Sequence, residues 1–302
     1  MQITYFADIR LPLERANGIQ TMETCHALAE RGHHVTLIAR PDTHTPRRDP
    51  YEYYGLHRHE RFMIERAPVA GPQFARRVGY LSFALGRAVG RGRADALFTR
   101  DLGVAALLAQ VPVAFRAPLV YESHGYAPEV SAELPGLVAT ARPAGARKLK
   151  RLAAREALVW REAAGYVTIT KGLADLLIDR FGPRPNVAVV PDGVRLPAER
   201  RWTPPPDGPV VVGYAGHLYS WKGTDVLLDA LALLPAVHGL IVGGHAAEPD
   251  LPRAIERAQH LGLAARVEFT GLIPPAAVPS ALERAGILVL PNLQTSISAR
   301  FS

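Results

Sequence analysis

The sequence predicts an α/β protein with two domains, each built around a parallel sheet. Short apolar, β-branched runs alternate with amphipathic stretches, as expected for parallel strands joined by crossover helices. The segment Pro197–Pro209, with five prolines in thirteen positions, interrupts this alternation, which then starts again. A length of 302 residues also suits two domains of about 150 residues each. We therefore expect a first domain at residues 1–200 and a second at 201–302, joined by a stiff linker.

The first domain opens with a predicted strand, Gln2–Phe6, followed by a loop at Asp8–Gly18 and an amphipathic helix at Ile19–Arg31. Gly32 is expected to end this helix. The further predicted strands are His34–Ala39, Ala94–Thr99, Leu119–Glu122, Tyr166–Thr170 and Val187–Val190. The further predicted helices are Phe74–Val89, Gly103–Gln110 and Ala146–Ala164. This alternation predicts a sheet covered by helices on both faces.

The second domain repeats the pattern with fewer elements. Its predicted strands are Val210–Tyr214, Leu240–Val242, Val267–Thr270 and Ile287–Leu290. Its predicted helices are Thr224–Leu234, Pro252–Leu261 and Pro275–Arg284. A doubly wound nucleotide-binding sheet has about six strands, so we expect this domain to be incomplete at Ser302, with an exposed apolar edge at its fourth strand.

Composition indicates a globular protein. Hydrophobic residues make up 48% and charged residues 21% of the chain, which excludes a disordered or fibrous class. The longest apolar stretch, Val226–Val242, contains Asp229, Pro235 and His238, so no membrane span is expected. The N-terminus lacks the basic head of a signal peptide, and Cys25 is the single cysteine. We therefore expect a cytoplasmic protein without disulfides.

The net charge of +7 is uneven along the chain. Residues 1–200 carry 28 basic and 20 acidic side chains, and residues 201–302 carry 7 and 8. No helix-turn-helix, zinc or RNA-binding signature accompanies this charge, so we expect no nucleic-acid partner. Any anionic partner surface is expected to meet the first domain.

The segment Val211–Ala230 carries the strongest chemical signal. A strand leads into Gly213 and Gly216, and Lys222-Gly223 directly precedes an amphipathic helix. Glycines let the backbone approach a phosphate closely, and a lysine at a helix N-terminus adds its charge to the positive end of the helix dipole. The pattern predicts an anion site; a surface lysine after a tight turn is the structural alternative.

The order of motifs resembles glycosyltransferase family 4. Members of this family are retaining enzymes of the GT-B architecture, in which two Rossmann-like domains face each other across a cleft. The resemblance covers nearly the whole chain. The matching segments are NGIQTMETCHALAERGHHVTLIAR from Asn17, YESHG from Tyr121, YVTITKGLADLL from Tyr166, VVPDGV from Val189, GYAGHLYSWKGTDVLLDAL from Gly213, LIVGG from Leu240 and VEFTGLIPPAAVPSALERAGILVLPN from Val267.

The resemblance implies a role for each matching residue. Lys222 and His124 are the implied catalytic residues: Lys222 would bind the diphosphate of a nucleotide-sugar donor, and His124 would contact the transferred sugar. Gly18 would present backbone N–H groups to the same phosphates. The residues implied to bind the donor are Gly18, Gly216, His217, Lys222, Gly223, Gly271, Leu272 and Ile273, of which the last three would contact the nucleobase.

Two departures from the family pattern weaken the expected donor site. His217 stands where relatives commonly have arginine, and a histidine is neutral in many molecules near pH 7. The family's two glutamates spaced eight residues apart would begin beyond Ser302, so neither is present. No Asp-x-Asp motif occurs, so we expect no metal ligands and no cofactor, with protein cations stabilising the diphosphate.

Several other polar residues have structural interpretations. Without the resemblance, His124 is interpreted as a hydrogen-bonded structural histidine at a strand end. Asp192, in the Asp-Gly pair of PDG, is interpreted as a turn residue. His44, His57 and His59 lie in an arginine-rich stretch without metal-ligand spacing, and we interpret them as solvated loop residues.

A basic, amphipathic segment spans residues 142–161. Its cations are Arg142, Arg147, Lys148, Lys150, Arg151, Arg155 and Arg161. One interpretation is a solvated helix face. The other is a peripheral contact with an anionic membrane at its inner face, as an enzyme for lipid-linked acceptors would need.

These observations predict a metal-independent, retaining glycosyltransferase. It would move a sugar from a nucleoside-diphosphate donor to a hydroxyl of a glycan or lipid-linked acceptor, as in cell-envelope glycan synthesis. The alternatives are a GT-B nucleotide-sugar 2-epimerase, which needs no acceptor, and an inactive nucleotide-binding fragment. A dehydrogenase is disfavoured because no G-x-G-x-x-G follows a strand.

Overall fold

The computed structural model describes residues 1–89, 94–138, 141–196 and 208–294. The chain divides into two compact units, one covering Met1–Ala132 and Ala144–Arg195 and the other covering Glu133–Pro143 and Leu196–Ala299. The predicted linker lies, except for its last two residues, outside the described residues. None of the described helices has both the length and the apolar character needed to cross a membrane.

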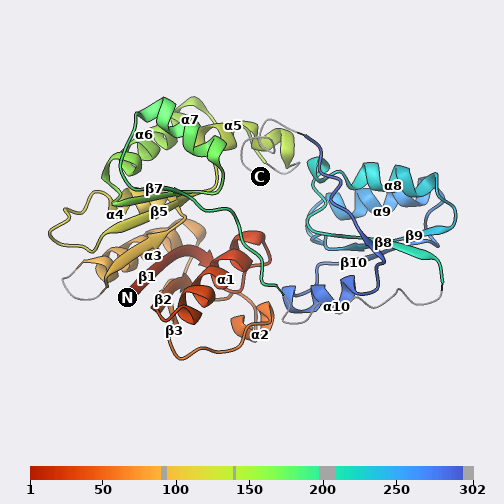
Figure 1. Ribbon diagram of the computed structural model, residues 1–302, viewed down its shortest axis with the longest axis horizontal. Coiled ribbons are helices and arrows are strands. Elements are labelled where there is room, and N and C mark those ends of the chain that lie inside the picture. Colours follow the sequence, from red (N-terminus) through yellow and green to blue (C-terminus); the bar gives the residue numbers. More distant parts are fainter. Residues whose placement is uncertain (90–93, 139–140, 197–207, 295–302) are drawn as a thin grey trace. The chain divides into compact units, whose positions relative to one another are not determined.

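The first unit contains a sheet of seven parallel strands in the order β3-β2-β1-β4-β5-β6-β7 (Figure 1). Its strands are β1 (Gln2–Arg10), β2 (His34–Arg40), β3 (Phe62–Arg66), β4 (Ala96–Thr99), β5 (Leu119–Ser123), β6 (Gly165–Thr168) and β7 (Val187–Val189). Strands β2 and β3 lie on one side of β1. The chain then crosses to the other side of β1, where it forms β4. The gap between β1 and β4 is therefore the topological switch point, where open α/β sheets bind ligands at their carboxyl edge.

The described helices before the linker are α1 (Ala16–Glu30), α2 (Pro50–Tyr54), α3 (Gln73–Ala88), α4 (Leu102–Leu108), α5 (Ala127–Leu137), α6 (Ala146–Glu162) and α7 (Lys171–Phe181). Side chains fix several of their starts. Asp49 caps α2, Asp101 caps α4 and Thr170 caps α7, each by accepting hydrogen bonds from backbone N–H groups of the first turn. Helix α1 packs on β1, β2 and β3, and α3, α4 and α6 pack side by side. Right-handed crossovers in opposite directions place these two groups on opposite faces of the sheet.

The second unit contains a smaller parallel sheet in the order β10-β9-β8-β11. Its strands are β8 (Val210–Ala215), β9 (Val237–Val242), β10 (Val267–Gly271) and β11 (Ile287–Leu288). Its helices are the 3-10 helices η1 (Ser220–Lys222) and η2 (Pro275–Ala277), and α8 (Thr224–Ala232), α9 (Asp250–His260) and α10 (Val278–Leu282). Helices α8 and α9 pack together around a core that includes Leu228 and Ile241.

The predicted apolar edge of this second sheet is confirmed among the described residues. Strand β11 lies at the edge of the sheet, and Ile287 is 51% and Leu288 60% exposed. Leu290, just beyond it, is 81% exposed. Such an edge favours association with other apolar surfaces.

The predicted strands are all present, but the sequence pattern misses some elements and misplaces some boundaries. Strand β3 and helices α2, α5 and α7 are not predicted as elements. The predicted loop Asp8–Gly18 is wrong at both ends, because β1 continues to Arg10 and α1 begins at Ala16.

Helix α6 carries a buried carboxyl group. The side chain of Glu156 is fully buried and accepts hydrogen bonds from the Ala127 N–H at 3.2 Å and from the Tyr166 hydroxyl at 3.1 Å. Burial raises the pKa of Glu156 to about 7, and the two hydrogen bonds oppose this rise only in part. The folded protein therefore holds a proton that the unfolded chain releases above its ordinary pKa of 4.5.

Glu156→Gln is expected to stabilise the protein at pH 8 and to change little at pH 5. As the pH rises from about 4.5 to 7, the unfolded chain loses its proton first, so stability falls, and above pH 7 the full penalty is on the order of 3 kcal/mol. Glutamine removes this penalty. Its Oε1 can still accept from the Ala127 N–H, and its Nε2 can donate to the Tyr166 hydroxyl oxygen, so the direction of the second hydrogen bond reverses. Thermal unfolding of the wild type and the variant from pH 5 to 8 measures this change in stability. The control is Glu162→Gln, at an exposed position of the same helix. A difference in melting temperature that does not vary with pH would contradict the assignment.

Candidate functional site

A pocket of about 280 Å³ opens at the switch point of the first sheet. Its lining comes from the end of β1, the first turn of α1 and the segment that joins β4 to α4. The lining residues are Ala7, Asp8, Ile9, Asn17, Arg100, Asp101, Leu102 and Gly103. The sheet topology explains this position, because β1 and β4 are neighbours whose following segments diverge to opposite faces.

Asp8 is the most deeply buried charged group of this pocket. Its side chain is 1% exposed, and its Oδ2 accepts a hydrogen bond from Arg77 Nη1 at 2.8 Å. Arg40 Nε lies 3.0 Å from Oδ1. Burial nevertheless raises the pKa of Asp8 to about 6, against the lowering effect of both arginines. The pocket therefore has a carboxyl group that titrates close to neutral pH.

Asp101 faces the same pocket from the start of α4. Its Oδ1 accepts the N–H groups of Gly103 and Val104 at 2.7 and 2.9 Å, which fixes the side chain at the helix N-terminus. Arg77 Nη2 lies 3.6 Å from Asp101 Oδ1, so this arginine bridges the two carboxylates of the pocket. The arrangement gives the pocket fixed acceptors that suit hydroxyl or amine groups.

Gln20 of α1 joins four segments beside this pocket. Its Oε1 accepts a hydrogen bond from Arg100, and its Nε2 donates to Asp192, in the segment after β7. The same Nε2 lies 3.4 Å from Glu122 Oε1 and 3.5 Å from His124 Nε2. Asp192, interpreted from sequence as a turn residue, therefore also has a partner within this network. Its carboxylate and the side chains of Glu122 and His124 place three potential metal-ligand atoms within 4.8 Å of one another.

His124 follows β5 and is oriented by Glu122, the penultimate residue of that strand. His124 Nε2 hydrogen-bonds Glu122 Oε1. An ionised carboxylate only accepts, so this contact assigns the proton to Nε2 and leaves the Nδ1 lone pair for another partner. The side chain of His124 is 23% exposed, which leaves it accessible to a small molecule.

Gly18 has a different position from the one expected. It lies within α1, where its N–H donates to the Arg15 carbonyl at 2.8 Å. A Cβ at this position would lie 2.6 Å from the Leu13 carbonyl oxygen, so the close packing of the preceding segment requires glycine here. The loop placement was wrong because α1 begins three residues earlier than the amphipathic pattern indicated.

In the second unit, three glycines gather at the carboxyl ends of β8, β9 and β10. The N–H of Gly216 donates to the Val242 carbonyl at 2.9 Å, and that of Gly243 donates to the Gly271 carbonyl at 3.0 Å. A Cβ on Gly243 would lie 3.0 Å from the carbonyl carbon of Gly216. At this carboxyl edge of the sheet Gly216 is exposed, and Gly243 and Gly271 are half-buried. Leu272, which follows Gly271, is 37% exposed. Ile273 comes next and is half-buried.

Lys222 ends the 3-10 helix η1, immediately before α8. Its Nζ lies 4.0 Å from the centre of the Trp221 ring, and burial lowers its pKa. Within the described part of the chain, its ammonium group forms no ion pair with a carboxylate. A half-buried cation at the start of a helix is suited to an anionic ligand.

Gly223 makes this turn possible. It adopts a left-handed conformation with φ of 72°, and a Cβ would lie 2.7 Å from the Pro291 carbonyl carbon. Gly223→Ala is therefore expected to destabilise the second unit by about 1–3 kcal/mol and to displace Lys222. Thermal unfolding measures this, with Gly262→Ala as control, since Gly262 also has a positive φ of 71° but no atom within 4 Å of the place that a Cβ would take. Equal losses of stability in Gly223→Ala and Gly262→Ala would show that backbone strain alone, without the contact at Pro291, causes the destabilisation.

His217 follows Gly216 and is held by an aromatic and acidic group. Its ring stacks on Tyr219 with centroids 4.9 Å apart, and its Nδ1 lies 3.7 Å from Glu248 Oε2. The Tyr219 hydroxyl donates to Glu248 Oε1 at 3.3 Å. Glu248 was not identified from sequence, because it lies 31 residues beyond His217.

Two family models match the chain. The glycosyl transferase 4-like domain matches residues 18–193, and the group 1 glycosyl transferases match residues 197–295. The chain belongs to the glycosyltransferase 4-like family.

Known proteins agree with this assignment. The glycosyltransferase is 29% identical over 153 residues to the 2-deoxystreptamine glucosyltransferase of Streptomyces kanamyceticus, which covers 45% of this chain and 39% of that protein. It is 34% identical over 134 residues to the D-inositol 3-phosphate glycosyltransferase of Stackebrandtia nassauensis, covering 38% of this chain and 30% of that protein. The matches thus span less than half of these relatives. Among solved structures, Anabaena HepE in complex with UDP-glucose has a TM-score of 0.63 at 17% identity, covering 95% of this chain and 73% of that one. The predicted GT-B fold class is confirmed.

The loop histidines of this glycosyltransferase correct one sequence interpretation. His44 and His57 are exposed as expected. However, the rings of His57 and His59 pack against the buried ring of His26 on α1, at centroid distances of 4.4 and 6.0 Å. The interpretation as solvated loop residues therefore holds for His44 and His57, whereas His59 is a loop residue that is half-buried.

Proposed function

We propose that this chain moves a sugar from a nucleoside-diphosphate donor to a hydroxyl acceptor with retention of anomeric configuration. The observation that carries the proposal is Lys222, a half-buried ammonium without a carboxylate partner among the described residues, placed where β8 leads into α8. A departing diphosphate supplies the missing negative charge. Electrostatic stabilisation of a leaving group is often the largest catalytic contribution.

The donor is proposed to bind along the carboxyl edge of the second sheet. Gly216 is exposed there and Gly271 is half-buried, so both could offer backbone groups, and Lys222 and His217 would supply positive charge without a metal ion or other cofactor. The structurally similar HepE was solved in complex with UDP-glucose, which makes a uridine nucleotide sugar the first donor to test. Leu272 and Ile273 then lie where a nucleobase would contact the chain beyond β10.

The acceptor is proposed to bind at the pocket of the first unit. The fixed oxygens of Asp8 and Asp101 and the guanidinium of Arg100 suit a polyhydroxylated molecule. The names of two relatives specify small polyhydroxylated rings, 2-deoxystreptamine and D-inositol 3-phosphate. A glycan or lipid-linked acceptor presents the same hydroxyl chemistry.

The test is a donor and acceptor screen with the chain. UDP-, GDP- and ADP-sugars are each incubated with and without polyol, glycan and lipid-linked acceptors, and NMR follows the anomeric proton. Transfer with retained configuration supports the proposal. Consumption or epimerisation of the donor without acceptor indicates the 2-epimerase, and nucleotide binding without turnover indicates an inactive fragment.

A membrane contact at the inner face of the cytoplasmic membrane is proposed for α6. Arg147, Lys148, Lys150 and Arg151 are exposed, whereas Glu156, Val159 and Trp160 are buried. Helix α6 packs against α4. The exposed cations thus form one face that an anionic surface would attract.

Vesicles rich in anionic lipid are expected to sediment the protein at low salt and to release it as salt rises, because the Debye length falls to about 10 Å at 0.1 M. Replacing Lys148, Lys150 and Arg151 with glutamate should abolish sedimentation and leave nucleotide affinity unchanged. The matched control is the same triple change at three exposed arginines outside α6, Arg31, Arg47 and Arg58. Equal sedimentation with neutral vesicles would contradict an electrostatic contact.

A further inference from the structure

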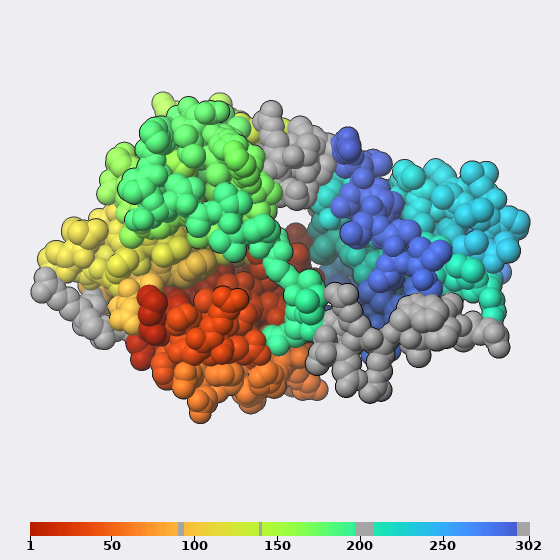
Figure 2. Space-filling view, viewed as in Figure 1, coloured from red at the N-terminus to blue at the C-terminus, as the bar shows by residue number. Residues whose placement is uncertain are grey.

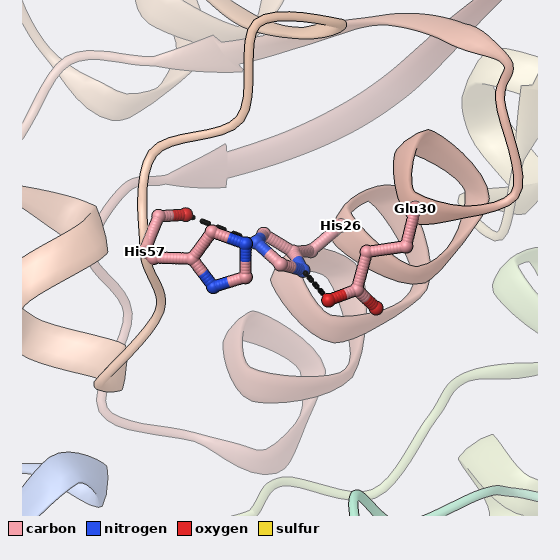
Figure 3. A group of neighbouring side chains, drawn as sticks. All are labelled: His26, Glu30 and His57. Carbon is pink, nitrogen blue, oxygen red and sulfur yellow. Dashed lines mark hydrogen bonds and ion pairs between the residues drawn. The ribbon is translucent and has the colours of Figure 1, made fainter.

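His26 is a buried histidine whose ring is fixed from one side. It lies in α1 with no exposed surface, and its Nε2 contacts the His57 carbonyl oxygen at 2.9 Å (Figure 3). A carbonyl oxygen only accepts, so Nε2 carries the proton and Nδ1 keeps its lone pair. Metal-binding histidines are commonly oriented in this way, with the second ring nitrogen donating to a backbone carbonyl.

The unprotonated nitrogen of His26 faces a carboxylate at ligand spacing. Glu30, one helical turn further along α1, places its Oε1 3.4 Å from His26 Nδ1. Two ligands of a tetrahedral zinc ion, each about 2.0–2.1 Å from the metal, lie about 3.3 Å apart. The His57 side chain completes a group of three whose ligand atoms lie within 4.8 Å of one another. Figure 3 shows the His26 ring between the Glu30 carboxylate, also on α1, and His57, which comes from the segment after α2.

A positive charge already occupies this position. Arg195 Nη2 lies 3.1 Å from His26 Nδ1, and the same guanidinium contacts Glu30 at 3.3 Å and Glu23 at 3.1 Å. These contacts attach the segment after β7 to the surface of α1, beside which it lies in the space-filling view (Figure 2). The acceptors around His26 therefore converge on a cation that the chain itself supplies.

We propose that His26, Glu30 and His57 bind a divalent transition metal of the zinc type, and that Arg195 fills this site when the metal is absent. Imidazole and carboxylate ligands suit zinc and its neighbours in the first transition series. The site supplies no step of sugar transfer. Because metal and guanidinium compete for the same acceptors, metal binding would release Arg195 from α1 and free the segment that leads to residue 197.

Titration calorimetry of the untagged chain with ZnCl₂ tests the site, and Co²⁺ absorption reports its ligand geometry. We expect one zinc per chain and a raised melting temperature. Glu30→Gln and His57→Ala should each weaken binding at least tenfold; both side chains are exposed, so these variants should fold. Arg195→Gln should bind zinc more tightly, because the competing cation is gone. His260→Ala, an exposed histidine in α9 of the second unit, is the matched control and should bind as the wild type does.

Three outcomes would overturn the proposal. The first is absence of zinc binding, and the second is wild-type affinity in both Glu30→Gln and His57→Ala. The third is unchanged or weaker binding in Arg195→Gln, which would show that the guanidinium does not compete with the metal. None of these measurements uses sugar transfer, so they stand whether or not the proposed transferase activity is found.

Discussion

Lys222→Ala is expected to weaken binding of a nucleoside diphosphate by roughly ten- to a hundredfold and to lower transfer by at least as much. The variant would remove the proposed charge-assisted contact with the diphosphate, and a contact of this kind contributes about 1.5–3 kcal/mol. The larger effect on transfer follows because the diphosphate gains negative charge as it leaves. Calorimetry with UDP, together with kcat/KM for the donor, measures both effects.

The matched control for this lysine is Lys171→Ala. Lys171 is 80% exposed and forms a surface ion pair with Asp175, so its loss should leave binding and transfer unchanged. Lys222→Arg keeps the charge but changes its geometry, and partial activity is expected. If Lys222→Ala binds UDP as tightly as the wild type, the diphosphate binds at another site on the protein.

His124→Ala is expected to lower kcat at least tenfold while changing nucleotide affinity little. The family resemblance implies that His124, in the first unit, contacts the transferred sugar, so its interaction should count mainly in the transition state. Glu122→Gln should cause a smaller loss of kcat. Glutamine can present either its carbonyl oxygen or its NH2 group to His124 Nε2, so it no longer holds the imidazole proton on Nε2 alone. Steady-state kinetics with separate kcat and KM values distinguishes these effects from weakened binding.

Folding controls accompany the His124 variants. Circular dichroism and the melting temperature should match the wild type, because His124 is partly exposed. Activity that falls only in proportion to the folded fraction would assign His124 a structural role, as the interpretation without the family resemblance holds. His245→Ala, in the second unit, serves as the comparison histidine.

Sequence analysis predicted the helices and strands whose hydrophobic pattern is contained within one short run of residues. The buried strands are continuous apolar runs, and Thr224 after Lys222-Gly223 was correctly predicted to begin a helix. Strand β3 was missed because FMIER places two charges in five residues at the edge of the sheet, where one side needs no apolar partner. Helix α5 was missed because Pro135 interrupts its pattern, although the structure accommodates this proline near the helix end.

The site was predictable only where its residues are close in sequence. Lys222, Gly223 and His217 lie within one strand-loop-helix segment, and they were named. The network around Gln20 was not found, since its partners Arg100 and Asp192 lie 80 and 172 residues away. No local pattern marks Gln20, which in sequence is one more polar position of an amphipathic helix. Its partners meet only because four parallel strand ends share one edge of the sheet.

The direction of β1 has a practical consequence for attaching this protein to a surface. Met1 is 61% exposed at the amino edge of the first sheet, and the pocket lies at the carboxyl edge. The extended chain from Gln2 to Asp8 makes six residue-to-residue steps and separates them by about 20 Å. A bead or sensor chip coupled through Met1 would therefore hold the protein with its pocket facing away from the support. The support would then not block ligands from entering or leaving the pocket of the tethered protein.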